Sequence, residues 1–581
     1  MKWPLRASAL AALASLVAEF GFPLSERAER FLHGLDLAIV AVFVLDVVLR
    51  TARAPRPGEH LRQHWLETLF AVLIFGAVAV PLATARWVDP GFAFARITVV
   101  GAQVYLLTIL ALATVRANEQ LATRAVRPAW LLVGSFLAVI LAGTLLLLLP
   151  ECRAPGAAPW TWLDALFTAT SATCVTGLSV RDVGSELSFR GQAVLCALMQ
   201  VGGLGLVTLA MFITWLQKRR LRLEQMTMVR DVLGIEALSD LGRFLGYALA
   251  VTFFAEALGA AVLYQGCAEP ALDPGGRAWW SIFHSVSAFC NAGFGLESDS
   301  FMRYAGSTFV SGAIGLLVIV GGLGFPVIYE LLHLDLRALP FARRRRAESG
   351  TIPTTPVQRI SVNARIVLAG TAALLVAGTL FFWVCERTHT LADRPASEQA
   401  LASWFQAAVP RTAGFNSLDV LRFADPTLLL VIVLMVIGAS PVSTGGGLKT
   451  TTVLLLGLAA RAAVRGRAEV EAFGRTIPRR AVNAAVAIAL LYAGALLSVT
   501  AALAATQRDS SFLQLLFEST SALSTVGLTI GVTAKADTFG RLVLCVAMLV
   551  GRVGPLAVLG SVIVLPATLR YQYPEEGVVV S

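Results

Sequence analysis

The stretch "SATCVTGLSV", residues 171–180, decides the organisation of this chain because it recurs three more times. The related stretches are "SAFCNAGFGL" (287–296), "VPRTAGFNSL" (409–418) and "SALSTVGLTI" (521–530). Aligned on their shared glycines, they follow one another at intervals of 116, 121 and 113 residues. A period this regular indicates internal duplication. The aligned glycines are Gly177, Gly293, Gly414 and Gly527.

Every copy occupies the same place in a repeating order of apolar segments. A first segment long enough to cross a membrane precedes it, at about 127–150, 241–266, 364–385 and 481–505. A short amphipathic run such as "WTWLDALFTAT" follows, and it falls short of the roughly 20 apolar residues that a bilayer requires. A second apolar segment ends the unit, at about 192–215, 308–332, 427–460 and 541–568. Each unit is therefore predicted to be a helix, a re-entrant half-helix, a loop and a helix.

The composition is that of a polytopic membrane protein. Of the 581 residues, 56% are hydrophobic and only 14% are charged. The net charge of +10 comes from arginines between the apolar segments, so it indicates cytoplasmic loops rather than nucleic-acid binding. The stretches that join one unit to the next, 217–243, 337–365 and 461–480, hold most of them. All four units then have the same orientation, which predicts parallel repeats around an axis normal to the membrane.

The predicted fold is an all-α polytopic membrane protein with four parallel helix–pore-loop–helix repeats around one central pore. Residues 1–125 lie outside the repeat and contain four apolar runs, which predict an N-terminal accessory transmembrane module. The predicted pore repeats are 126–235, 236–360, 361–478 and 479–581, the third containing an intramembrane gate loop.

The glycine stretches suit the chemistry of a cation pathway. A cation that enters a bilayer must exchange its hydration shell for other oxygens, and backbone carbonyls are dense and neutral ligands. Glycine permits the unusual φ and ψ angles that direct successive carbonyls toward one axis. A single such stretch is most simply a turn, but four in register, each after a half-helix, favour a ring of carbonyl ligands.

These stretches, with "QVGGLG" (200–205), "GGLGFPV" (321–327) and "GRVGPL" (551–556), resemble the Trk/Ktr/HKT superfamily of potassium transporters over about residues 127–581. The resemblance implies one filter glycine per repeat and, because none of the four is serine, a preference for potassium. The filter would comprise twelve residues whose carbonyls bind K⁺ as the only metal: Val175, Thr176, Gly177, Asn291, Ala292, Gly293, Thr412, Ala413, Gly414, Thr525, Val526 and Gly527.

The third repeat contains an interruption, "GASPVSTGGGLKTTT" (438–452), within an otherwise apolar segment. As one helix, residues 427–460 would be ~51 Å long, against a hydrocarbon core of ~30 Å. Proline and the glycine run favour a break, and we expect this break to be peculiar to the third repeat. The alternative is a closely packed kink. The predicted gate comprises Gly438, Ser440, Pro441, Gly445, Gly446, Gly447, Lys449 and Arg552, the last of which would either repel K⁺ or cap freed carbonyls.

Four other charged residues lie at membrane depth, where ionisable groups are costly, and two of them leave alternatives open. Glu518 would attract cations or bond nearby backbone. Arg411 would brace the filter or face outer solvent. Asp164 is expected to be the N-cap of the first half-helix. Glu256 is a candidate for coupling transport to protons.

The sequence thus predicts potassium uptake through a gated four-repeat pore in the bacterial inner membrane, with the joining loops cytoplasmic. The alternative is a sodium- or proton-coupled cation symporter of the same architecture. No enzyme is predicted, since no catalytic constellation is present. The family resemblance implies a homodimer and a TrkA/KtrA-like cytoplasmic subunit. This chain has no nucleotide-binding motif, so ATP, ADP or NAD would act only through that partner.

Overall fold

The computed structural model describes residues 128–205, 241–267, 272–333 and 360–554, with isolated positions among the first 51 residues. The chain separates into two compact units. One comprises Met1–Val126 and Leu149–Arg153, including the short helix η1 (Pro150–Cys152), and the other comprises Arg127–Leu148 and Ala154–Ser581. The predicted N-terminal module, the first two joining stretches and the end of the last apolar segment lie largely outside the described residues.

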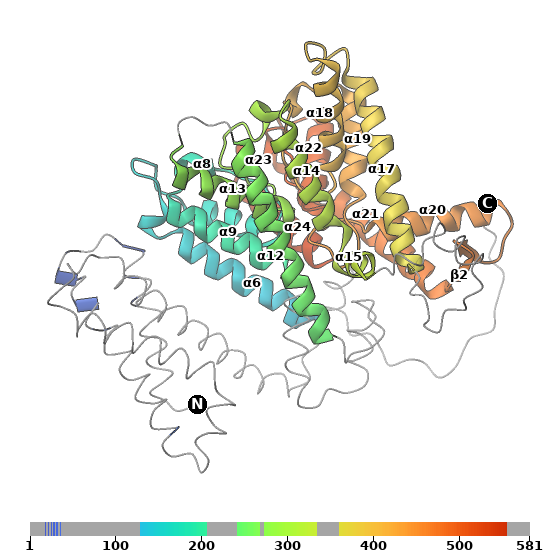
Figure 1. Ribbon diagram of the computed structural model, residues 1–581, viewed down its shortest axis with the longest axis horizontal. Coiled ribbons are helices and arrows are strands. Elements are labelled where there is room, and N and C mark those ends of the chain that lie inside the picture. The colour runs from blue at the N-terminus through green and yellow to red at the C-terminus, as the bar shows by residue number, and fades with distance from the viewer. Residues whose placement is uncertain are drawn as a thin grey trace, which may run out of the picture. The chain divides into compact units, whose positions relative to one another are not determined.

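Four helix groups follow one another along the second unit (Figure 1). The opening helices are α6 (Pro128–Leu147), α12 (Leu241–Gly266), α17 (Val362–Glu386) and α21 (Arg479–Thr506). The short helices are α7 (Trp162–Thr173), α13 (Pro274–Phe289), α18 (Ala396–Ala408) and α22 (Phe512–Leu523). The closing helices are α9 (Phe189–Gly203), α14 (Thr308–Leu323) with α15 (Phe325–Leu332), α19 (Asp425–Val436) with α20 (Thr450–Val464), and α24 (Thr538–Val553).

Smaller elements lie between these helices. A two-stranded antiparallel hairpin connects the third group to the fourth and pairs Val470 with Ile477. Its strands are β1 (Val470–Ala472) and β2 (Arg475–Ile477). The remaining short helices are α8 (Val183–Glu186), η3 (Met302–Tyr304), η5 (Val420–Arg422) and α23 (Val532–Lys535).

Capping residues fix where many of these helices begin. Thr161 caps α7 and forms a capping box with Asp164, so Asp164 is the third helical residue rather than the expected N-cap. Ser511 forms the equivalent box at α22. Three closing helices also begin at a residue whose side chain accepts from a backbone N–H three positions later, which satisfies an otherwise unpaired donor. These N-caps are Ser188 (α9), Ser307 (α14) and Asp537 (α24).

The helix contacts close into a cycle. Each short helix packs against the opening helix of its own group: α7 on α6, α13 on α12, α18 on α17 and α22 on α21. Each also packs against the closing helix of the preceding group: α13 on α9, α18 on α14, α22 on α19 and α7 on α24. The last contact joins the fourth group back to the first, so the contacts of the short helices form a closed cycle.

Several helices are suited to lipid. Among the described residues, Gly246–Gly266, Val362–Glu386 and Arg479–Thr506 are long and apolar enough to cross a membrane, and the bent pair α14–α15 adds a fourth if it counts as one span. Their outward faces expose large apolar side chains such as Phe254, Leu380 and Leu490. Exposed apolar surface of this extent indicates a non-aqueous environment.

The closing segment of the second group is broken as well as that of the third. Helix α14 ends before Gly324, which has φ 88°, and α15 leaves at an angle of 98° to it. The expectation that the break is peculiar to the third segment is therefore wrong. Gly554, at the end of α24, has a similar backbone conformation, with φ 94°. What distinguishes the third segment is the length of its interruption, residues 437–449.

Candidate functional site

The four aligned glycines form a closed ring, which we call the glycine ring: Gly177, Gly293, Gly414 and Gly527. A Cβ atom added to any of them would lie no more than 2.6 Å from a carbonyl oxygen of the next loop. Those oxygens belong, in turn, to Ala292, Ala413, Val526 and Thr176. Each loop thus contacts its successor so closely that only glycine fits.

All four loops have the same unusual backbone. The ring glycines have φ between 65° and 98°, and the residue two positions earlier also has positive φ, between 50° and 91°. Those earlier residues are Val175, Asn291, Thr412 and Thr525. Positive φ is rare for β-branched residues, so three of the four hold a strained conformation. Strain of this kind persists where the surrounding structure enforces it, and it marks candidate functional sites.

The ring loops leave buried carbonyl oxygens without partners. The eight residues that precede the glycines by one or two positions are each 0% exposed. Within the described part of the chain, neither their carbonyl oxygens nor those of the ring glycines accept a hydrogen bond. Buried carbonyls are normally paired, so a dense group of unpaired ones has the composition of a cation site.

The ends of the short helices hold these loops in place. Backbone hydrogen bonds join Thr176 N to Ser171 O, Ala292 N to Ser287 O and Val526 N to Ser521 O, at 2.7–2.8 Å. The third loop differs, because there Ala413 N donates to Val409 O instead. The closing helices pack tightly against the helix ends through glycine. Gly202, Gly321 and Gly551 approach the last carbonyls of α7, α13 and α22 too closely for any larger residue.

The interrupted segment, residues 437–449, packs against the ring loops and the second group. Ser440 N and Thr444 N donate to the carbonyls at the end of α14, Gly322 O at 3.0 Å and Gly321 O at 3.3 Å. The Pro441 carbonyl faces Gly324 so closely that a side chain there would not fit.

The glycines of the segment lie beside the ring loops and at the neck of the segment. We call neck the place where its first residues, 438–439, meet residues 446–450. A Cβ on Gly445 would contact Thr412 Oγ1, and one on Gly446 would contact Thr525 Oγ1. One on Gly438 would meet the Gly446 carbonyl, so the two ends of the segment are in contact. Gly447 has φ 67°, and Lys449 Nζ donates to Gly445 O at 2.7 Å. Two of the predicted gate residues, Gly445 and Gly446, therefore lie beside two of the predicted filter residues.

Arg552 connects this segment to the first group. It is only 8% exposed. Nη1 donates to the Thr444 carbonyl, and Nη2 donates to the carbonyls of Gly202 and Gly203, the latter at 3.2 Å. Gly203 is the last residue of α9, so the guanidinium caps a helix end as well as the interrupted segment. Of the two roles expected for Arg552, the capping of freed carbonyls is the one that these contacts support.

The buried carboxylates differ in their surroundings. Glu518 is 0% exposed, and it accepts from the backbone N–H groups of Ile530, Val532 and Thr533. This arrangement favours the backbone-bonding alternative for Glu518. Glu256 accepts from Gln200 Nε2 at 3.3 Å and lies 3.8 Å from the Cys290 thiol.

Arg411 is buried, which excludes the outer-solvent alternative: it is 7% exposed and donates to Thr371 Oγ1 and Thr450 Oγ1. Thr444 and Thr450 were not among the predicted site residues. Both are polar residues within the otherwise apolar third closing segment, in the stretch 438–452. Their polarity is the sequence feature that could have identified them as site residues.

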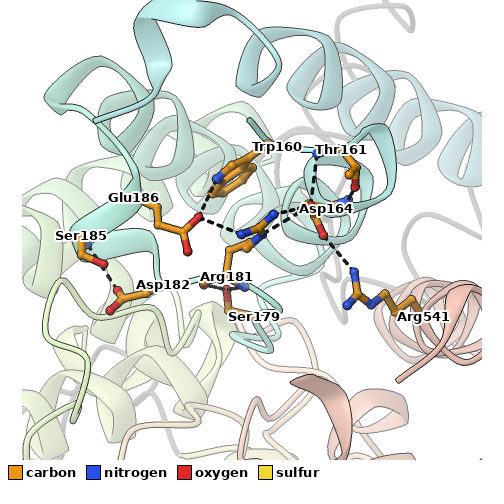
Figure 2. A network of polar contacts seen from close by, with 9 residues as sticks. All are labelled: Trp160, Thr161, Asp164, Ser179, Arg181, Asp182, Ser185, Glu186 and Arg541. Carbon is orange, nitrogen blue, oxygen red and sulfur yellow. Dashed lines mark hydrogen bonds and ion pairs between the residues drawn. The ribbon is translucent and has the colours of Figure 1, made fainter. Parts of the chain in front are cut away.

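A polar network joins the first group to the fourth (Figure 2). Asp164 accepts from Arg181 Nη2 at 3.3 Å and from Arg541 Nη1 at 2.9 Å. Arg181 also pairs with Glu186, which accepts from Trp160 Nε1. The Arg541–Asp164 ion pair connects two groups. Arg541 and Arg552 are eleven residues apart on α24, about three turns, so both face the first group.

Comparisons with known proteins agree with this architecture. The chain is 37% identical to "Ktr system potassium uptake protein B" of Vibrio alginolyticus, covering 76% of this chain and 93% of that protein. It is 33% identical to "Potassium/sodium uptake protein NtpJ" of Enterococcus hirae, covering 78% and 96%. A Bacillus subtilis "Ktr system potassium uptake protein B" is 34% identical, covering 74% and 91%.

A solved structure and a family model extend the likeness. The fold matches the crystal structure of the potassium transporter TrkH from Vibrio parahaemolyticus with a TM-score of 0.59 and 19% identity, over 85% of this chain and 96% of that one. The family model TrkH, described as a cation transport protein, matches residues 96–569. Because this match spans most of the sequence, the chain belongs to the TrkH family of cation transport proteins.

Proposed function

We propose that this protein takes up potassium across the bacterial inner membrane through a pore on the axis of the glycine ring. The observation that carries the proposal is the set of buried carbonyl oxygens without hydrogen-bond partners in the four ring loops. Such oxygens replace the hydration shell of a cation. The names of the relatives, which specify potassium uptake, support potassium as the ion.

The four helix groups are proposed to be parallel pore repeats at 126–235, 236–360, 361–478 and 479–581, with residues 1–125 as an accessory module. The cyclic contacts of the short helices support this assignment. Each short helix ends at a ring loop, so its C-terminal partial negative charge favours a cation near the ring. The arginine-rich stretch 461–480 supports a cytoplasmic location for the joining loops.

The interrupted segment is proposed to be the gate, held in a closed position by Arg552. In support, the segment contacts Thr412 and Thr525 of the ring loops, and Arg552 binds the Thr444 carbonyl. A guanidinium next to the cation pathway also repels K⁺. Release of the segment from Arg552 would remove both the contact and the obstruction.

Control of the gate is assigned to a cytoplasmic nucleotide-binding subunit, and the transporting chain is proposed to form a homodimer. The relatives are named as components of a Ktr system, which supports a multi-component assembly. A sodium- or proton-coupled symporter is the second candidate. The buried Glu256 beside Cys290 and the name of the Enterococcus hirae relative, which specifies potassium and sodium, favour it.

Rubidium uptake into proteoliposomes tests the proposal. We expect uptake by the wild type that potassium inhibits strongly and sodium weakly, and loss of this discrimination in Gly414→Ser, because a side chain there meets the Val526 carbonyl. Absence of rubidium flux from folded wild-type protein would refute the proposal. Flux that requires a proton or sodium gradient, and that Glu256→Gln abolishes, would favour the symporter.

A further inference from the structure

Arg411 occupies a position that is uncharged in the other three repeats. Three residues before the ring glycine stand Cys174, Cys290 and Ser524, whereas the third repeat has arginine. In the second and fourth repeats this side chain contacts the opening helix of its own repeat: Cys290 lies beside Glu256, and Ser524 bonds Tyr492. Arg411 does the same through Thr371 on α17.

Arg411 also bonds a second partner, which lies on the closing segment of its own repeat. Its Nη2 donates to Thr371 Oγ1 at 3.4 Å and to Thr450 Oγ1 at 3.2 Å. Thr450 is the first residue of α20, where the helix resumes after the interrupted segment. A side chain from a ring loop is therefore bonded to the end of the gate segment.

Thr450 closes the neck of that segment. Its hydroxyl donates to Gly438 O at 2.9 Å, and its backbone N–H donates to Ala439 O at 3.2 Å. A hydroxyl has one proton and two lone pairs, so it can donate to Gly438 while it accepts from Arg411. The bonds run without a gap from the third ring loop through Arg411 and Thr450 to the neck.

Burial makes the position of Arg411 costly. The residue is 7% exposed, its Nε has no hydrogen-bond partner among the described residues, and no described carboxylate pairs with it. The end of α18 just before it supplies partial negative charge, but a buried guanidinium without a counter-ion still carries a desolvation penalty. The cysteine or serine at the equivalent position of the other repeats carries no such charge penalty.

We propose that Arg411 is a positioning residue that couples the filter to the gate, so that a change at the neck of the gate segment alters ion selectivity. This rests on the proposed function of both elements. When the neck opens, Thr450 moves away from Gly438 but keeps its bond to Arg411, which carries the movement to the third ring loop. Without the bond to Thr450, that loop loses a restraint at the residue next to Thr412, whose positive φ depends on its surroundings. A loosened carbonyl ring discriminates less between potassium and sodium.

Thr450→Val tests the coupling, because valine keeps the β-branched shape and removes only the hydroxyl. A hydrogen bond from a charged donor is strong enough to shift an equilibrium about tenfold. We expect roughly a tenfold rise in basal rubidium flux and a matching fall in the rubidium-to-sodium flux ratio. Thr451→Val, on the same helix and without contact to Arg411 in the described structure, is the matched control and should change neither.

A second set of variants separates coupling from simple support. Thr371→Val removes the other bond of Arg411 and leaves the neck intact, so it should lower the flux ratio without raising basal flux. In a double-mutant cycle, Arg411→Gln and Thr450→Val should be strongly non-additive in the flux ratio. A purely structural role would lower the amount of folded protein but leave the flux ratio of the remaining protein unchanged.

Each result bears on one claim. The coupling is refuted if Thr450→Val resembles Thr451→Val in both readouts, or if basal flux rises while the flux ratio stays at the wild-type value. The proposed gating role of the segment would still be supported in that case if deletion of residues 440–446 raises basal flux. A folded wild type without rubidium flux would instead overturn the proposed function, and the coupling with it.

Discussion

Replacing Arg552 with methionine removes a cation that bonds three carbonyls while retaining much of the side-chain volume. Two of these bonds, to Gly202 and Gly203, join α24 to α9. Of the three Arg552 bonds, only the one to the Thr444 carbonyl reaches the interrupted segment. The bias toward the proposed closed position should therefore fall by about one hydrogen bond from a charged donor, roughly 1.5–3 kcal/mol. This corresponds to about a 10- to 150-fold increase in the open-to-closed ratio.

The assay is the initial rate of rubidium uptake per folded protein in proteoliposomes, with the cytoplasmic partner absent. Arg508→Met removes an exposed arginine and serves as the control for loss of one positive charge. Arg552→Lys retains the charge but loses the forked donor geometry. If the uptake rate rises in both Arg552 variants, hydrogen bonding stabilises the proposed closed state. If the rate rises only in Arg552→Met, the positive charge does. A folded Arg552→Met protein with a wild-type rate would refute the reasoning.

Three further predictions concern contacts outside the gate. Arg541→Met should lower the melting temperature of the detergent-solubilised protein, because Asp164 loses its partner in the fourth group; an unchanged melting temperature would mean that this pair adds nothing. Gly551→Ala should abolish rubidium uptake or folding, because the added Cβ collides with the end of α22; normal uptake would contradict the packing. Burial alone raises the pKa of Asp182, but hydrogen bonds from Ser298 and neighbouring residues outweigh it and hold the pKa below 3.8. This carboxylate therefore stabilises the fold above pH 3.8 and loses its contribution as the pH falls through the lowered pKa, so Asp182→Asn should reduce the drop in melting temperature between pH 5 and pH 3.

The sequence predicted the helices well where hydropathy and length determine them. The expected segment 241–266 coincides with α12, and 364–385 and 481–505 differ from α17 and α21 by one or two residues at each end. The interruption in the third closing segment was also predicted, because proline and glycine leave a clear compositional signal. The bend at Gly324 was missed although Pro326 follows it two residues later, since glycine and proline in an apolar run are also compatible with a helix that is only kinked.

Side-chain contacts between distant segments could not be predicted. Asp164 and Arg541 are 377 residues apart, and nothing in either local sequence indicates the other. The sequence left Arg411 either buried or exposed, because only the packing of α17 and α20 around the third ring loop decides between them. The twelve predicted filter residues remain a proposal, although the closed order of their glycines is now visible in the structure.

The single occurrence of Arg411 has a consequence for how the proposed four-repeat pore evolves. A channel built from four identical subunits must place every side chain at the axis four times, and four guanidiniums around one cation pathway would exclude the ion they surround. A chain that encodes its four quadrants separately escapes this constraint, because each quadrant accumulates substitutions alone. Three of the repeats keep a small neutral residue at this position, while the third repeat along the chain carries a long charged one that contacts Thr450, beside the proposed gate. Four repeats encoded in one chain thus permit one repeat to carry a residue that the other three lack, which an assembly of identical subunits does not allow.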